Sequence, residues 1–235
     1  MPSFSGLTYL FGFFVTAFLS YRFFQYWQRE KTYTAKNFFY FIVIFASFCL
    51  ITALGAILFP QNLIFLKGVV ISATFLQGLA YAFLGALTVY LKFPRFSPKY
   101  GFGLVFLLGI IGTILIAALP FNPHLMENNW IDWDIQFWPG VFRLTVHLLA
   151  FLPLGVIMIQ QGLSSLESEA KEREAGLGLI FLLFSLSTPL IFIVKGSLPE
   201  RIGEDFIALV ILSLVLIIVV LTQKPSKPKW VKKIE

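Results

Sequence analysis

Two ionisable residues, Arg143 and His147, stand inside an apolar stretch of the chain, in the segment GVFRLTVHLL. Their four-residue spacing places them on one face of a helix, about one turn below the membrane surface. An ionisable side chain at that depth should face the bundle interior or a wet cavity. Arg143 would then hold an anion or an internal acid, and His147 would titrate near neutral pH. Alternatively, Arg143 extends to the interface and pairs with a surface carboxylate.

The connection 120–140, PFNPHLMENNWIDWDIQFWPG, combines aromatic with polar side chains. Trp130, Trp133 and Trp138 suit the aromatic belt at a membrane interface. The alternative is a lid over a ligand site, because polar groups stand beside this aromatic surface. The predicted ligand-binding or partner-binding residues are Arg143, His147, His124, Trp130, Trp133, Asp132 and Asp134.

The remaining residues argue against catalysis and bound cofactors. His124, His147 and Cys49 are too few for a zinc site of the usual ligand count. Between their ends, the apolar runs lack the Asp, Glu or Lys that proton and ion pathways generally need. No hydrolase, metalloprotease or phosphate-cradling motif is present. We therefore expect a protein that is not an enzyme and that holds no metal and no cofactor.

The composition identifies an integral membrane protein. Of the 235 residues, 58% are hydrophobic and only 13% are charged, and the mean hydropathy is +0.84. A soluble domain carries about 25% charged residues, so a soluble enzyme, a disordered chain and a disulfide scaffold are excluded. The net charge of +6 fits contact with anionic lipid and does not indicate nucleic acid.

Seven runs approach the length of about 20 apolar residues that a spanning helix needs. They are 4–21, 38–59, 68–91, 102–119, 140–161, 176–194 and 204–222. Pro and Gly stand at the breaks between them, and the runs lack the alternating polarity of barrel strands. The sequence predicts an all-α bundle of seven transmembrane helices in one domain, 1–222, followed by a short basic tail, 223–235.

The basic residues predict the orientation, because cytoplasmic loops retain Lys and Arg. Fourteen of the 18 lie in 22–36, 92–99, 171–173 and 224–233, and the other four are Lys67, Arg143, Lys195 and Arg201. This asymmetry predicts an N-terminus outside the cell and a C-terminus in the cytoplasm, in the inner (plasma) membrane.

Small residues recur at helical spacing on two of the predicted helices. Gly78, Ala82 and Ala86 form a stripe on the third helix, and Gly109 and Gly112 lie on the fourth. Such residues let two helix backbones approach closely. We expect them to pack helices within the bundle, with dimerisation as the alternative.

The order of features resembles a known family. The fourth predicted helix ends in the turn PFNPH at 120–124, a Trp-containing loop follows, and the fifth helix opens after Gly140 with His147 in the membrane. With seven helices and an outside N-terminus, this order is similar to the seven-helix sensor region at the N-terminus of many bacterial histidine kinases. In those kinases, catalytic domains follow the seventh helix, whereas here only 222–235 follow. The resemblance implies a stand-alone relative that acts through a partner, or a former sensor bundle reused as a scaffold.

Three hypotheses of function follow from the sequence. The first is a non-enzymatic, receptor-like inner-membrane protein with a ligand or partner site on its outer half. The second is an accessory or scaffold subunit of a larger membrane complex, whose aromatic surface packs on other helices. The third is a small transporter of a neutral or lipid-like substrate. In each of them the lipid bilayer is a partner, a membrane protein partner is expected for the first two, and a small-molecule ligand is compatible with the first.

Overall fold

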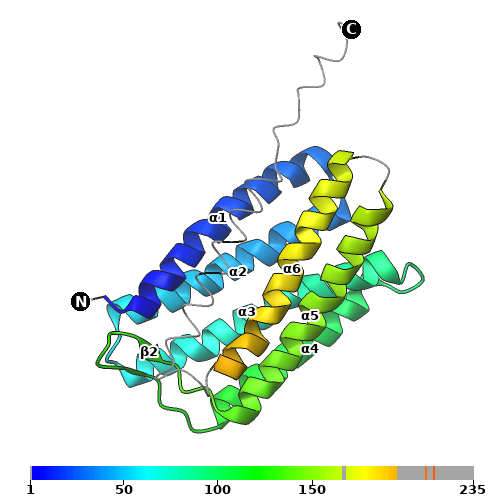
Figure 1. Cartoon of the computed structure of the whole chain (residues 1–235). Helices are drawn as coiled ribbons and strands as arrows, with labels where there is room; N and C mark the ends of the chain where they lie inside the picture. Colours follow the sequence, from blue (N-terminus) through cyan, green and yellow to red (C-terminus); the bar gives the residue numbers. More distant parts are fainter. Residues whose placement is uncertain (1, 166–167, 195–209, 211–213, 215–235) are drawn as a thin grey trace, which may run out of the picture.

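The computed structural model describes residues 2–165, 168–194, 210 and 214. Within them it contains six long helices and two short strands (Figure 1). The elements in chain order are α1 (Phe4–Glu30), α2 (Tyr33–Leu58), α3 (Leu63–Lys92), α4 (Pro98–Ala118), β1 (His124–Leu125), β2 (Ile131–Asp132), α5 (Phe137–Ser164) and α6 (Ser168–Val194).

Five of these helices, α1 to α5, are long and apolar enough to cross a membrane. The chain is therefore a helical, multi-pass membrane protein. The helices run beyond the predicted apolar runs at several ends. The helix α1, for example, continues to Glu30, because hydropathy detects only the apolar part of a helix and not its polar last turns. The predicted seventh run, 204–222, and the basic tail lie outside the described residues.

Polar side chains fix where four of the helices begin. Ser3, Thr32, Asn62 and Ser97 each accept a hydrogen bond from a backbone N–H in the first turn of α1, α2, α3 and α4 respectively. Such caps satisfy N–H groups that have no partner inside the helix. At its other end, α1 stops at Lys31, whose φ of 54° is left-handed.

The helices pack mainly against their neighbours in the chain. The most extensive contacts join α1 to α2, α3 to α4 and α5 to α6, and α3 also packs against α2 and α5. In the elongated bundle of Figure 1, the N-terminus and the β1–β2 hairpin lie at the same end. The helix α3 thus occupies the centre of the contacts, which makes it the element through which other helices can be coupled.

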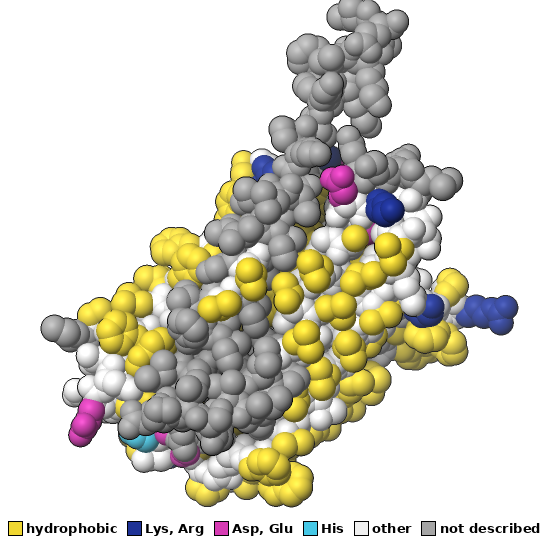
Figure 2. Space-filling model, in the orientation of Figure 1, with side chains coloured by type: hydrophobic (Ala, Val, Ile, Leu, Met, Phe, Trp, Pro, Cys, Tyr) yellow, Lys and Arg dark blue, Asp and Glu magenta, His cyan; other side chains and the backbone are white. Residues whose placement is uncertain are grey.

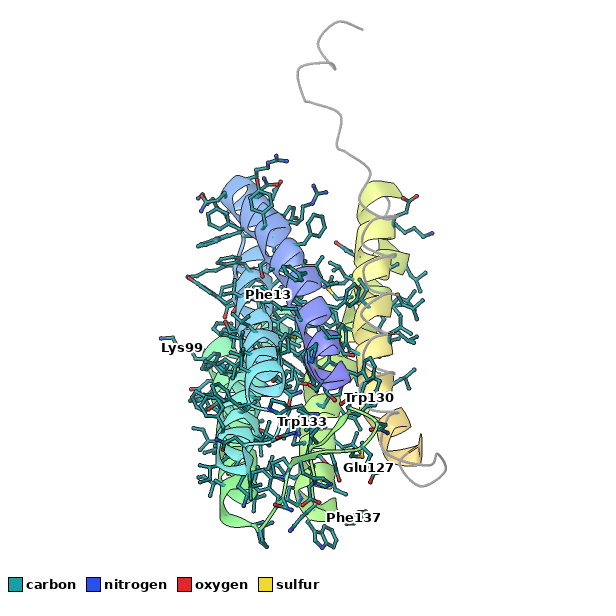
Figure 3. The ribbon with its side chains drawn as sticks, turned by 90° about the vertical axis from the view of Figure 1, so that its left-hand side faces the viewer. Phe13, Lys99, Glu127, Trp130, Trp133 and Phe137 are labelled. Carbon is teal, nitrogen blue, oxygen red and sulfur yellow. The ribbon has the colours of Figure 1, made fainter. Side chains whose placement is uncertain are left out.

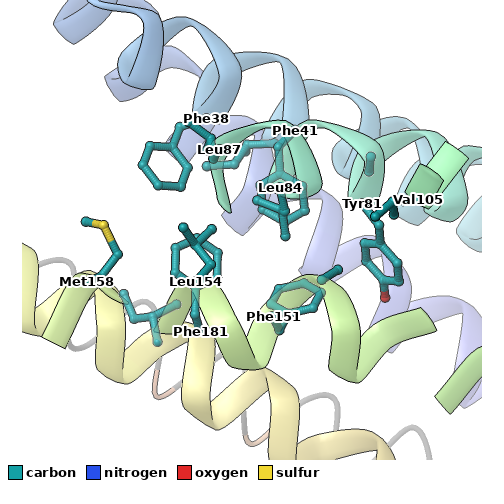
Figure 4. Packing of buried hydrophobic residues seen from close by; sticks show 14 of the residues in the cluster. Phe38, Phe41, Tyr81, Leu84, Leu87, Val105, Phe151, Leu154, Met158 and Phe181 are labelled. Carbon is teal, nitrogen blue, oxygen red and sulfur yellow. The ribbon is translucent and has the colours of Figure 1, made fainter. Parts of the chain in front are cut away.

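The core lies where α2, α3, α5 and α6 meet. Phe151 and Leu154 of α5 are completely buried, as are Leu84 and Leu87 of α3. Figure 4 shows the α5 side chains pointing toward those of α2 and α3. Phe181 of α6 lies in the same cluster, where its ring stacks on that of Phe38 with 5.6 Å between the centroids. Large aromatic and aliphatic side chains therefore fill the bundle interior.

Glycines bring α3 and α4 into backbone contact. A Cβ atom added at Gly78 would lie only 2.7 Å from the Cα of Gly109, and one added at Gly85 would lie 2.7 Å from the carbonyl oxygen of Gly101. Ala82 and Ala86 are buried on the same helix. The predicted stripe thus lies inside the bundle, and the contact of Gly85 with Gly101, two turns along α3 from that of Gly78 with Gly109, lies within its length.

Gly112 has a different role from the other predicted packing residues. A Cβ atom there would lie 3.3 Å from the ring of Phe142, so Gly112 faces α5 and not α3. A similar close approach joins α5 to α6, where a Cβ atom on Gly178 would lie 2.8 Å from the backbone nitrogen of Ile159. Small residues therefore set the spacing of two helix pairs.

Hydrophobic side chains cover the long sides of the bundle. Many large ones are exposed, among them Phe14, Ile64, Leu104 and Ile114. On the face drawn in Figure 2, yellow side chains follow the helices, whereas the dark blue Lys and Arg side chains lie toward the end away from the hairpin. An apolar belt with charged ends is the surface that a lipid bilayer requires.

Candidate functional site

A chain of hydrogen bonds crosses the bundle from α5 through α3 to α6. Nη2 of Arg143 donates to Oε1 of Gln77 at 2.8 Å, and Nε2 of Gln77 donates to the hydroxyl of Tyr81 at 2.7 Å. That hydroxyl lies 2.8 Å from Nδ1 of His147, whose Nε2 lies 2.6 Å from the carbonyl oxygen of Phe184. Five residues on three helices thus form one continuous polar path, which we call the Arg143–Phe184 chain.

The partners fix the direction of every proton in this chain. The carbonyl of Phe184 can only accept, so Nε2 of His147 donates to it. In a neutral imidazole the other nitrogen then accepts, and the hydroxyl of Tyr81 donates to it. The same hydroxyl accepts from the Gln77 amide, whose oxygen accepts from Arg143. Each residue therefore donates to the next one, and no donor competes with another.

Two pairs at helical spacing build the chain. Gln77 and Tyr81 are four residues apart on α3, as Arg143 and His147 are on α5. The two faces oppose each other, because α3 packs against α5. Sequence reasoning found the α5 pair but missed the α3 pair. The signal for the latter was Gln77, a polar amide in the middle of an apolar run, where polar side chains face the bundle interior.

An aromatic cluster surrounds the inner half of the chain. The ring of Phe151 stacks on His147 with 4.5 Å between the ring centroids, and it meets the ring of Tyr81 edge to face with 5.1 Å between the centroids. Phe151 also stacks on Phe184 at 5.5 Å. Tyr81 is 3% exposed and His147 is 6% exposed. Because water is excluded here, these hydrogen bonds are electrostatically stronger than they would be in water, and an unpaired group would be costly.

The outer half of the chain is more open. Arg143 and Gln77 are both partly buried, in contrast to Tyr81 and His147. The hydrogen bond that the structure gives Arg143 goes to a partly buried amide on α3 and not to a surface carboxylate. The guanidinium therefore faces the bundle interior, where it forms the accessible end of a path that leads to the core.

The connection between α4 and α5 folds into a small hairpin fixed to the N-terminus. Its two strands pair His124 with Asp132 and Leu125 with Ile131. The backbone N–H of Phe4 donates to the carbonyl of Asn129 at 2.8 Å, and the N–H of Ile131 donates to the hydroxyl of Ser5 at 2.9 Å. Hydrogen bonds between segments more than 120 residues apart in the chain thus hold the hairpin over the end of α1.

The three Trp residues of this connection have different environments. Trp133 is 7% exposed and packs with Ile131 in a cluster formed by α2, α3 and α4, with its ring 6.1 Å from Tyr9. Trp130 is partly buried against Phe4, whereas Trp138 is 74% exposed. Figure 3 shows Trp130 and Trp133 on the hairpin beside α1. Trp133 therefore departs from the predicted interfacial belt, because it anchors the hairpin in the protein interior.

The two predicted carboxylates of this connection shape the loop itself. The backbone N–H of Asp134 donates to Oδ1 of Asp132 at 2.9 Å, and the N–H of Asn122 donates to Oδ2 of Asp134 at 2.6 Å. Asp132 is 5% exposed. His124 is exposed, and its Nδ1 lies 2.9 Å from the carbonyl of Asn122. These contacts stabilise the hairpin and its return to α5.

The predicted site residues thus fall into two groups. Arg143 and His147 belong to the Arg143–Phe184 chain between α3, α5 and α6. The other five, His124, Trp130, Trp133, Asp132 and Asp134, belong to the hairpin and its flanks over α1 to α4. Among the described residues, no three His, Cys, Asp or Glu side chains form a group that could hold a metal ion.

Comparison with known protein families, with curated proteins and with solved structures finds no match for the chain. The resemblance to a kinase sensor region therefore stays a prediction, and the function is argued from the geometry of the Arg143–Phe184 chain.

Proposed function

We propose that this protein is a non-enzymatic, receptor-like protein of the inner membrane that binds a small anion at the outer end of α5 and acts through a protein partner. The observation that carries the proposal is the Arg143–Phe184 chain. It begins at a partly exposed cation and ends in the buried core, and it joins three helices through side chains that are all hydrogen-bonded.

The energetic cost of such a chain supports a functional role. A charged side chain at the centre of a membrane helix costs about 2.5–3.5 kcal/mol on insertion scales; Arg143 lies near the outer end of α5, where the cost is smaller but still unfavourable. Hydrogen bonds between membrane helices return on average only about 0.6 kcal/mol each. Apolar side chains of similar volume would pack α3 against α5 without that cost. The presence of Arg143, Gln77 and His147 at these positions therefore favours a site over a purely structural contact.

The geometry supplies a way for an anion to act. An anion beside Arg143 would compete with Oε1 of Gln77 for the guanidinium, and it would form an ion pair, bidentate where its oxygens allow, that a neutral amide oxygen does not offer. Once Gln77 loses its donor, its amide can turn, and the hydroxyl of Tyr81 loses or changes its partner. Because the chain joins α3, α5 and α6, the relative position of these helices then depends on whether the anion is bound.

The charge distribution supports the orientation. In the described residues, exposed Lys and Arg side chains gather at the α1–α2 and α3–α4 connections, and Lys171 adds one at the start of α6, at the end away from the hairpin (Figure 2). The positive-inside rule assigns that end to the cytoplasm. The hairpin and Arg143 then face the outside, where a soluble anion would arrive.

A thermal-shift titration tests the proposal. Purified protein in mild detergent is titrated with acetate, succinate, sulfate and phosphate, and its unfolding temperature is compared with that of Arg143→Gln. The matched control is Lys67→Gln, which removes the other described cation at the same end, where its Nζ lies 5.6 Å from the ring of Phe121.

We expect at least one anion to raise the unfolding temperature of the wild type and of Lys67→Gln by about 5 °C at saturation, and to leave Arg143→Gln unshifted. Equal shifts in wild type and Arg143→Gln would contradict a site at Arg143. The absence of any shift across the panel would contradict binding of a small anion of these classes.

A further inference from the structure

A groove at the basic end of the bundle has the features of a lipid site. It has a volume of about 250 Å³ and opens between the first turns of α2, the second half of α3 and the first turns of α4. Two exposed lysines, Lys36 of α2 and Lys99 of α4, lie on its rim. No acidic residue lines it, so its rim attracts anions.

The wall of the groove is a continuous row of aromatic rings from three helices. The ring of Tyr40 on α2 lies 5.4 Å from that of Phe83 on α3, and Phe83 lies 5.1 Å from Phe102 on α4. The ammonium group of Lys36 lies 5.8 Å above the ring of Tyr40. The ammonium group of Lys36 therefore lies over the α2 end of the aromatic row.

The depth of these residues matches the layers of a bilayer. Lys36 and Lys99 precede the predicted apolar runs 38–59 and 102–119 by two and three residues. Residues just outside an apolar run are expected at the level of the lipid phosphates, whereas Phe83 lies inside the run 68–91 and Phe102 begins the run 102–119. A cationic rim above an apolar wall complements a molecule with an anionic head and a hydrocarbon chain.

We propose that this groove binds an anionic phospholipid of the surrounding leaflet, with its phosphate between Lys36 and Lys99 and one acyl chain along Phe83 and Phe102. A free phosphate ion would use the rim alone and leave the aromatic wall in contact with bulk lipid. A zwitterionic lipid would place its own cation beside the two lysines. The proposal does not depend on the function of the Arg143–Phe184 chain, since the two sites share no residue.

Native mass spectrometry of the purified full chain tests this assignment. The protein is released from mild detergent in the presence of phosphatidylglycerol or phosphatidylcholine, and the apparent affinity for each is measured. The test variant is the double substitution Lys36→Gln/Lys99→Gln, and both lysines are exposed, so the fold should tolerate it. The matched control is Lys92→Gln/Arg95→Gln, which removes two exposed cations at the same end that do not line the groove.

We expect the wild type and the control to bind phosphatidylglycerol roughly thirtyfold more tightly than the test variant does, because each of the two lysines contributes about 1 kcal/mol of attraction to an anionic lipid. We also expect phosphatidylcholine to bind all three proteins weakly and equally. Equal loss in both double variants would overturn the proposal, because the attraction would then belong to the whole basic end. Displacement of the lipid by millimolar inorganic phosphate would overturn it as well, since the groove would then be a simple anion site.

Discussion

The hydroxyl of Tyr81 lies 2.8 Å from Nδ1 of His147, and the two residues are 66 positions apart in the chain. This single contact joins the central helix α3 to α5, and through Nε2 of the same imidazole it reaches α6. Both side chains are almost fully buried beside Phe151. In the proposed function, this contact is therefore the point at which a change at the outer end of α5 would reach the core.

Removing one partner of this contact should destabilise the protein measurably. Tyr81→Phe leaves Nδ1 of His147 without a donor and should lower the free energy of unfolding by about 1 kcal/mol, within the range for hydrogen bonds between membrane helices. His147→Phe should cost a similar amount. In a double-mutant cycle measured by denaturant unfolding in detergent, the two substitutions should couple by about 0.5–2 kcal/mol.

The matched control is Tyr100→Phe, which changes a residue that is 70% exposed and should alter stability by less than about 0.5 kcal/mol. If the losses in free energy of unfolding from Tyr81→Phe and His147→Phe were additive, the two side chains would not interact in the purified protein.

Close backbone contact between α3 and α4 predicts a strong difference between two glycines on one helix. Gly78→Ala places a Cβ atom against the Cα of Gly109 and should destabilise the protein by about 1–3 kcal/mol. Gly68→Ala meets nothing within 4 Å and should stabilise the helix by up to about 1 kcal/mol. Thermal unfolding of both variants in the same detergent checks this pair. Equal changes in stability for Gly78→Ala and Gly68→Ala would mean that α3 and α4 are not in close backbone contact at Gly78.

The hairpin predicts that Trp133 matters for its volume and not for its N–H group. The indole Nε1 is buried with no hydrogen-bond partner among the described residues, so Trp133→Phe loses no hydrogen bond. Trp133→Ala should cost about 3–5 kcal/mol by leaving a cavity, and Trp133→Phe much less. Trp138→Ala, at a side chain that is 74% exposed, should have little effect on stability. A large loss in Trp133→Phe would reveal a hydrogen bond to Nε1.

Cysteine labelling tests the orientation. Cys49 is 2% exposed, and a Cys49→Ser background removes it from the experiment. In that background, Glu127→Cys at the hairpin should react with a membrane-impermeant maleimide in spheroplasts, whose plasma membrane is sealed. Arg95→Cys, at the α3–α4 connection, should react only after the membrane is opened. Labelling in the reverse order would place the N-terminus in the cytoplasm.

The sequence predicts the helical membrane class, because long apolar runs have few other structures available to them. It also indicates the helix faces that carry Gly78, Gly109, Arg143 and His147, since the periodicity of a helix is local information. The residues against which those faces pack could not be predicted from the sequence. Nothing near Arg143 in the chain points to Gln77, and the choice between an amide on α3 and a surface carboxylate depends on how three helices pack.

The connection 120–140 also depends on long-range contacts that local sequence does not reveal. Its composition suits an aromatic belt, and local sequence does not distinguish a Trp at the interface from one that is buried. The burial of Trp133 depends on contacts with Tyr9 and on the hydrogen bond between Ile131 and Ser5, which lie more than 120 residues away. The predicted run 204–222 lies outside the described residues and stays a prediction.

The central claim, that Arg143 binds an anion while a partner protein carries the response, is tested most directly in the native membrane. Wild type and Arg143→Gln are purified in parallel in mild detergent, and mass spectrometry identifies the proteins and small molecules that accompany each. The account predicts the same stoichiometric protein partner with both, and a small anion with the wild type alone. Loss of the partner from a folded Arg143→Gln protein, with no difference in small molecules, would contradict the account and make this residue part of a subunit interface.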